Sequence, residues 1–98
     1  MKSQKEPIAA HVEWNEEAAK LLKIELIKRN MTHNQLAEKL NALGISESAN
    51  SIKQKIFRGT FQFSFFLQCA VALDLRVLKL DELLDNVKEL TSGETGST

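Results

Sequence analysis

The 98-residue sequence is poor in residues that interrupt helices or cross-link chains. It has one proline, Pro7, one cysteine, Cys69, and four glycines, of which only Gly44 and Gly59 lie between residues 8 and 90. That long stretch is therefore open to helices. β-Branched residues and turn pairs are too sparse for a sheet. We expect an all-α chain.

Several classes of protein are excluded by what is missing. The sequence has no run approaching the roughly 18 consecutive apolar residues of a membrane span, so we expect no membrane association. The start, MKSQKEPIAAH, has no apolar stretch of signal-peptide length. The lone Cys69 cannot form an internal disulfide, which fits a reducing compartment. We expect a cytoplasmic protein.

Catalytic and metal-binding patterns are also absent from the sequence. Its two histidines, His11 and His33, and Cys69 do not have the spacing of metal ligands, and no glycine-rich phosphate loop is present. Acidic pairs such as Glu16-Glu17 are typical of helix starts and have no obvious base beside them. A cysteine in an apolar helix is typical of packing. We expect neither an enzyme nor a cofactor.

The net charge is zero, but the charges are unevenly distributed along the chain. Residues 1–19 carry two basic and four acidic side chains, and residues 81–98 carry one basic and five acidic. In contrast, residues 20–45 have five basic and two acidic side chains, and residues 46–60 have three and one. A basic middle between acidic ends can orient a molecule on a polyanion. Chance variation of a solvated surface would give the same pattern.

Apolar residues at helical spacing predict a compact bundle of about five helices, containing a helix-turn-helix. We expect these helices near residues 15–29, 32–43, 48–58, 61–73 and 80–90. The single domain would cover residues 14–90. A flexible or short helical lead-in would occupy residues 1–13, with Trp14 covering one end of the core. The polar stretch TSGETGST at 91–98 predicts a flexible tail.

The second predicted helix has the clearest start and stop signals. Thr32 and Gln35 have the spacing of a capping box, and Gly44 is typical of the left-handed residue that ends a helix. Between them lies an apolar stripe of Leu36, Ala37, Leu40 and Leu43.

The third predicted helix has one apolar side and one polar side. Ser46 and Ser48 are alternative caps, and Gly59 ends the helix. The inward stripe consists of Ile45, Ala49, Ile52 and Ile56. The outward side carries Asn50, Gln54 and Arg58 in line, flanked by Ser51, Lys53 and Lys55. Nothing apolar larger than alanine lies on that outward strip.

Five phenylalanines between residues 57 and 66 raise the alternatives of core packing and base stacking. Burying each contributes roughly 1.5–3 kcal/mol, and a small domain needs that stabilisation, so we favour the core. The expected buried stripe of the fourth helix contains Phe63, Phe66, Leu67, Ala70, Val71 and either Leu73 or Ala72. Thr60 would cap that helix, with Ser64 as a rival. Phe57, Phe61 and Phe65 lie off the stripe, so one of them would cover a corner or an interface.

The segments MTHNQLAEKL, GIS, SIKQKIFRG, FLQCAVALDL and LDELL resemble the lambda-repressor-like (xenobiotic-response-element-type) helix-turn-helix fold from Thr32 to Leu84. The matching features are a threonine-capped helix with Leu36-Ala37, a turn, and a recognition helix that ends in Arg58-Gly59. More narrowly, Trp14 together with RGTF and FFLQC resembles a group of small bacterial proteins catalogued as a domain of unknown function.

The sequence departs from the repressor-like pattern at several positions. The turn before Gly44 and the spacing from Ile52 to Gly59 are both longer than usual. His33 stands where that fold has a phosphate-contacting glutamine, and Phe57 stands where an acidic residue is usual. These departures are compatible with an altered docking angle or with use of the fold for protein contact.

The broader resemblance implies sequence-specific binding of double-stranded DNA by a small prokaryotic or phage transcriptional regulator. Asn50, Ser51 and Gln54 would contact base edges, because amide side chains pair bidentately with adenine. The expected phosphate contacts are His33, Lys53, Lys55 and Arg58. The alternative is a non-catalytic protein–protein interaction module, either an adaptor or antitoxin-like. A homodimer would form through Leu80, Leu83, Leu84, Val87 and Leu90, a stripe that would otherwise close the core.

Overall fold

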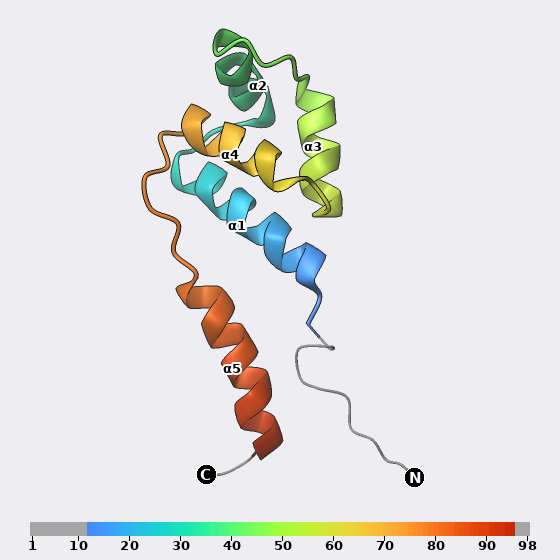
Figure 1. Cartoon of the computed structure of the whole chain (residues 1–98), viewed down its shortest axis with the longest axis vertical. Helices are drawn as coiled ribbons and strands as arrows, with labels where there is room; N and C mark the ends of the chain where they lie inside the picture. The colour runs from blue at the N-terminus through green and yellow to red at the C-terminus, as the bar shows by residue number, and fades with distance from the viewer. Residues whose placement is uncertain (1–11, 96–98) are drawn as a thin grey trace. The chain divides into compact units, whose positions relative to one another are not determined.

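The computed structural model describes residues 12–95 of the chain, and the side-chain surroundings of residues 12–88 (Figure 1). The helices are α1 (Trp14–Lys28), α2 (His33–Ala42), α3 (Ala49–Arg58), α4 (Phe63–Ala72) and α5 (Asp81–Thr95). No strand occurs in residues 12–95. The expected all-α architecture of five helices is therefore confirmed. Most of the predicted lead-in, and the end of the predicted tail, lie outside the described residues.

Residues 14–77, which include α1 to α4, form one compact unit. Helix α3 packs against both α1 and α2, and α2 packs against α4. Cys69 is fully buried there as a packing residue, as the sequence predicted. The largest fully buried side chains are Leu22, Leu36, Leu40, Ile52, Ile56 and Cys69. All six come from α1 to α4, so these helices share one core.

Helix α1 begins one residue earlier than expected and contains a buried acid. Trp14 is its first residue and is half exposed, so it covers the end of the core only in part. Glu25 is buried and pairs with the guanidinium of Arg29, with Nη1 2.6 Å from Oε1. Arg29 Nε also donates a hydrogen bond to the carbonyl oxygen of Leu73 at 2.9 Å. The ends of α1 and α4 are therefore connected through one side chain.

Helix α2 starts with the predicted capping box. The Thr32 hydroxyl accepts a hydrogen bond from the Gln35 amide at 3.1 Å, and the Gln35 side chain accepts one from the Thr32 amide at 2.9 Å. Gly44 follows the helix with the expected positive φ of 87°. Leu43, predicted to be buried, is exposed because α2 ends at Ala42 and the chain turns outward.

The chain crosses from α3 to α4 through a close contact with α1. Gly59 is left-handed, with φ of 68°, and a Cβ there would lie 1.9 Å from the carbonyl oxygen of Asn15. Three residues that belong to no helix follow before α4, so its N-cap is Gln62 rather than the predicted Thr60 or Ser64. The Gln62 side chain makes no capping hydrogen bond. The end of α3 is thus fixed by the start of α1.

Helix α4 buries only part of the predicted stripe, namely Phe66 and Leu73. Phe65, Phe66 and Cys69 face the core, together with Leu73, the C-cap residue. Phe63, which was predicted to be buried, is 69% exposed, and Leu67 and Val71 are 49% and 68% exposed. The prediction was wrong because α4 is apolar on two sides and carries no charged residue, so the pattern does not fix its rotation.

Helix α5 lies in the second unit, with residues 78–98, and is described by itself. It starts at Asp81 and ends at Thr95, five residues beyond the expected end at residue 90. Gly93 weakens a helix by about 1 kcal/mol but does not stop it. None of the helices in residues 12–95 has both the length and the apolar character needed to cross a bilayer.

Candidate functional site

Helix α3 is held so that one side faces the core and the other faces solvent. Ser48 caps the helix, because its hydroxyl accepts a hydrogen bond from the Ser51 amide at 3.0 Å. The alternative cap Ser46 is not used. Ile52 and Ile56, one turn apart, are buried, whereas Ile45 and Ala49 are partly buried and pack against the same core. The predicted inward stripe of α3 is therefore confirmed, and its backbone presents a defined outward side.

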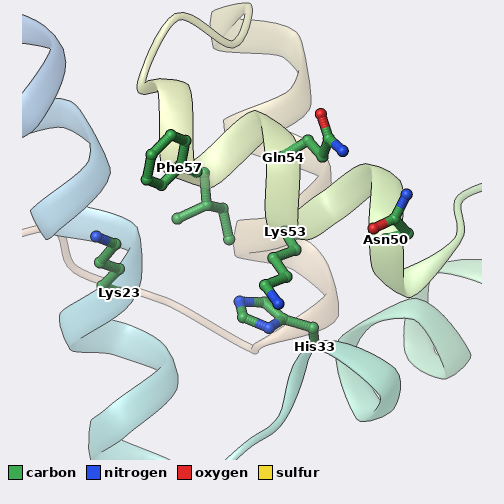
Figure 2. Close-up of a pocket in the computed structure, with 7 residues that line it drawn as sticks. Lys23, His33, Asn50, Lys53, Gln54 and Phe57 are labelled. Carbon is green, nitrogen blue, oxygen red and sulfur yellow. The ribbon is translucent and has the colours of Figure 1, made fainter.

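Four side chains stand on that outward side and form the face on which the site is built. Asn50, Lys53, Gln54 and Phe57 are all exposed, and we refer to them as the α3 outer face. Figure 2 shows them along one helix, with His33 and Lys23 facing them from neighbouring helices. Ser51 is only half exposed and lies at the flank.

An open hollow runs beside the α3 outer face. Its volume is about 500 Å³, and it is lined by Lys23, His33, Asn50, Lys53, Gln54, Ile56 and Phe57 (Figure 2). A second hollow of about 340 Å³ lies beside the first and is lined by Thr32, His33, Asn34, Ala49, Asn50 and Lys53. The two share three side chains, namely His33, Asn50 and Lys53. The start of α2 and the start of α3 therefore border one continuous surface.

The cations around this surface differ in whether they are already neutralised. Within residues 12–88, neither Lys23 nor Lys53 has a carboxylate partner. Arg58 donates to the side-chain oxygen of Gln54 at 3.3 Å and also lacks an acidic partner there. Lys23, Lys53 and Arg58 therefore give this side of the domain an uncompensated positive charge.

Lys55 stands apart from the other predicted phosphate contacts. Its ammonium forms an ion pair with Glu47 at 2.5 Å, and it lies over the ring of Phe65 at 4.6 Å from the centroid. The side chain of Glu47 is 9% exposed, so this pair is largely shielded from water. The two hollows bring together four of the seven predicted site residues, namely His33, Asn50, Lys53 and Gln54. Ser51 lines neither hollow, and Arg58 borders a separate one with Lys55. Lys55 helps to pack α3 onto α4.

Two side chains of this surface did not enter the predicted site. Lys23 lies on α1, and no local pattern in the sequence connects it to α3. Phe57 is 81% exposed, so the prediction that nothing apolar larger than alanine lies on the outward strip of α3 was wrong. The sequence did give a signal for Phe57, because it lies off the buried stripe expected for the fourth helix. Its position at the edge of the hollow is visible only once α1 and α3 are packed (Figure 2).

The described residues give no sign of metal or nucleophilic chemistry. Residues 12–95 contain no group of three or more histidine, cysteine or acidic side chains placed to hold a metal ion. Burial raises the pKa of the Cys69 thiol from 9.0 to about 12, the Glu47 carboxylate adds to this rise, and the Lys55 ammonium opposes it. A thiol with so high a pKa is a poor nucleophile at neutral pH.

Together, the fold and the surface define a small all-α domain with a polar, cationic helix face. The model of a family described as Domain of unknown function (DUF6471) matches residues 14–78, which is well over half of the chain. The chain belongs to that family, and the narrower resemblance seen in the sequence is confirmed to this extent. No match was found among curated proteins or among solved structures.

Proposed function

We propose that this domain is a sequence-specific binder of double-stranded DNA, acting as a small transcriptional regulator without catalytic activity. The observation that supports the proposal best is the two-sided character of α3. Ile52 and Ile56 anchor the helix in the core, and Asn50, Lys53 and Gln54 stand exposed on the opposite side. An anchored helix with exposed amides and cations fits the requirements of a recognition helix.

The relation between α2 and α3 supports the same proposal. The two helices pack against each other and are joined by residues 43–48, which include Gly44. This order supports a helix-turn-helix with a turn longer than the usual one. The major groove of B-DNA is about 12 Å wide and admits one helix. In this docking, Asn50 and Gln54 pair with adenine edges and Ser51 contacts a base from the flank.

The phosphate contacts come from three helices. Lys53 and Arg58 on α3 and Lys23 on α1 carry charges without a carboxylate partner in residues 12–88. His33 is the first residue of α2, where the helix dipole favours an anion. We leave Lys55 out of these contacts because Glu47 already neutralises it.

A salt series with duplex DNA tests this proposal. About three neutralised phosphates predict a log–log slope of affinity against salt near −3, whereas a slope near zero contradicts DNA binding. Gln54→Ala should relax the preference at one base position while leaving the slope unchanged. Gln62→Ala, at the N-cap of α4, is the matched control and should change neither. A loss of preference in both variants would contradict the role of α3.

A protein-interaction module is the second candidate, and one observation favours it. The exposed side of α4 carries Phe63, Leu67 and Val71 at successive turns, and α4 has no charged residue. Exposed apolar surface of this kind often marks a protein contact. Here the chain would purify with a stoichiometric protein partner and no nucleic acid absorbance. Leu67→Glu should then abolish the complex, and Gln54→Ala should not.

We also propose a homodimer through the apolar side of α5, because regulators of this kind bind two half-sites. Leu80, which precedes α5, and Leu84 are exposed, whereas Leu83 and Val87 are half-buried; the side chain of Leu90 lies outside the described part of the chain. Light scattering should give twice the monomer mass, and Leu84→Lys should halve it. A monomeric wild-type chain contradicts the dimer.

A further inference from the structure

The α3 outer face contains one side chain whose chemistry differs from that of its neighbours. Phe57 is 81% exposed and lines the hollow with Gln54, Lys53 and Lys23. It contributes little to the core, which α3 supplies through Ile52 and Ile56. A large apolar ring placed in water between an amide and two ammonium groups is costly for a free domain. Its position is explained if a ligand covers it.

The position of Phe57 along α3 limits what it can reach. Seven residues separate it from Asn50, and at 1.5 Å per residue this corresponds to about 10 Å along the helix axis. Base pairs rise about 3.4 Å each along the duplex. A helix lying along the major groove therefore carries Phe57 about three base-pair steps beyond the base that Asn50 contacts.

The major groove offers one apolar group to such a ring. The C5 methyl of thymine is the only methyl group on an unmodified base edge there, and cytosine, adenine and guanine present polar atoms. Because a phenylalanine side chain cannot form hydrogen bonds, it contributes most binding free energy by burying apolar surface against this methyl group. Lys23, on α1 beside Phe57, is placed to hold a phosphate of the same stretch of backbone (Figure 2).

We propose that Phe57 is a specificity-determining residue that selects thymine through its C5 methyl group, about three base pairs from the adenine read by Asn50. The inference rests on the proposed binding of double-stranded DNA. It adds recognition of thymine to that function, which the polar residues of α3 do not provide.

The test begins with selection of bound duplexes from a random-sequence pool. Each thymine of the selected site is then replaced by deoxyuridine, which removes only the methyl group. Burial of one methyl predicts a three- to fourfold loss of affinity at one position. Phe57→Ala should bind the thymine and deoxyuridine duplexes equally. Cytosine replaced by 5-methylcytosine at that position should recover part of the affinity in the wild type only.

Phe63→Ala provides the matched control, because Phe63 is a second exposed phenylalanine, 69% exposed, on α4. That variant should keep the discrimination against deoxyuridine. Urea unfolding of Phe57→Ala checks that the fold persists, as expected for an exposed side chain. If unfolding shows a loss of structure, Phe57→Ser provides the same comparison, because it also removes the apolar contact with the methyl group.

The outcomes separate the two proposals. If no duplex is selected, the proposed function fails. If duplexes are selected but no thymine shows the effect, or Phe57→Ala retains it, the role of Phe57 is wrong and DNA binding stands. Tighter binding to single strands than to duplex, lost in Phe57→Ala, overturns both and points to base stacking.

Discussion

Arg29 connects the C-terminal ends of α1 and α4, because its Nε donates a hydrogen bond to the carbonyl oxygen of Leu73 at 2.9 Å. The same guanidinium pairs with buried Glu25 and also donates to the Glu25 carbonyl oxygen at 3.0 Å. One side chain therefore satisfies a buried carboxylate and two backbone carbonyls. No buried polar side-chain atom in the described part of the chain lacks a partner.

Arg29→Met should lower the free energy of unfolding by about 2 kcal/mol, because it leaves the Glu25 carboxylate buried without its closest cation. Urea unfolding followed by circular dichroism measures the change. Lys20→Met is the control, since Lys20 pairs with Glu17 at 3.2 Å near the surface and should cost no more than about 0.5 kcal/mol. Equal losses in the two variants would show that Arg29 does not have this structural role.

Gly59→Ala should be far more damaging than Gly44→Ala. Both glycines have positive φ, so each substitution carries a backbone cost of about 1 kcal/mol. At Gly44 a Cβ meets nothing within 4 Å, whereas at Gly59 it meets the Asn15 backbone. We expect a loss of about 3 kcal/mol at Gly59, measured as a shift of the urea midpoint. Similar midpoints for both variants would mean that α1 does not approach α3 this closely.

Lys55→Met should change stability but not DNA binding, whereas Lys53→Met should change DNA binding but not stability. Lys55→Met leaves Glu47 unpaired and should lower the free energy of unfolding by about 1 kcal/mol, without changing the salt dependence of DNA affinity. Lys53→Met should leave stability within about 0.5 kcal/mol and reduce the magnitude of the salt slope by about 1. The reverse pattern would assign the phosphate contact to Lys55.

The buried thiol of Cys69 predicts a loss of stability at alkaline pH. Its folded pKa is about 12, above the ordinary 9.0. The thiol is protonated in both states below pH 9, so its contribution is fully present there. Between pH 9 and 12 the unfolded chain releases a proton that the folded chain retains. Stability therefore falls as pH rises, by up to about 1.4 kcal/mol per pH unit.

Urea unfolding at several pH values measures this fall, and Cys69→Ala serves as the reference. The variant should be less stable below pH 9 because of the cavity, but it should lack the part of the slope that comes from the thiol. Parallel curves for the two proteins would show that the thiol is not buried in the folded state.

The sequence was sufficient to predict α2 and α3 because local signals determine both. The Thr32–Gln35 capping box, Gly44 and the isoleucines of α3 each act within a few residues, and each lies where the pattern indicated. The bounds of these helices differ from the expected ones by one residue at most, which is the usual ambiguity of helix ends.

The sequence was not sufficient to predict the rotation of α4 or the pairing of Lys55. Phe63 and Phe66 both fit an apolar stripe, and only the position of α2 against α4 decides which is buried. The ion pair between Lys55 and Glu47 joins residues on the two sides of Ser48, and its burial depends on Phe65. Such facts depend on tertiary packing, which no local pattern encodes.

The surroundings of Lys23 and Phe57 also could not be predicted from local sequence patterns. Lys23 lies in the middle of α1, more than thirty residues before Phe57, and the hollow between them exists only because α3 packs on α1. The sequence was therefore sufficient to identify the polar residues of α3, but not Lys23 and Phe57 near its C-terminal end.

The residues that hold α3 in place are not the ones that it exposes to solvent, so the exposed residues can be substituted. Its cap, its two isoleucines and its terminal glycine all act from positions other than Asn50, Lys53, Gln54 and Phe57. Those four positions can accept new side chains while the scaffold stays intact. A library randomised at these codons should yield many folded members with altered ligand preference, and relatives of this domain are free to diverge there fastest.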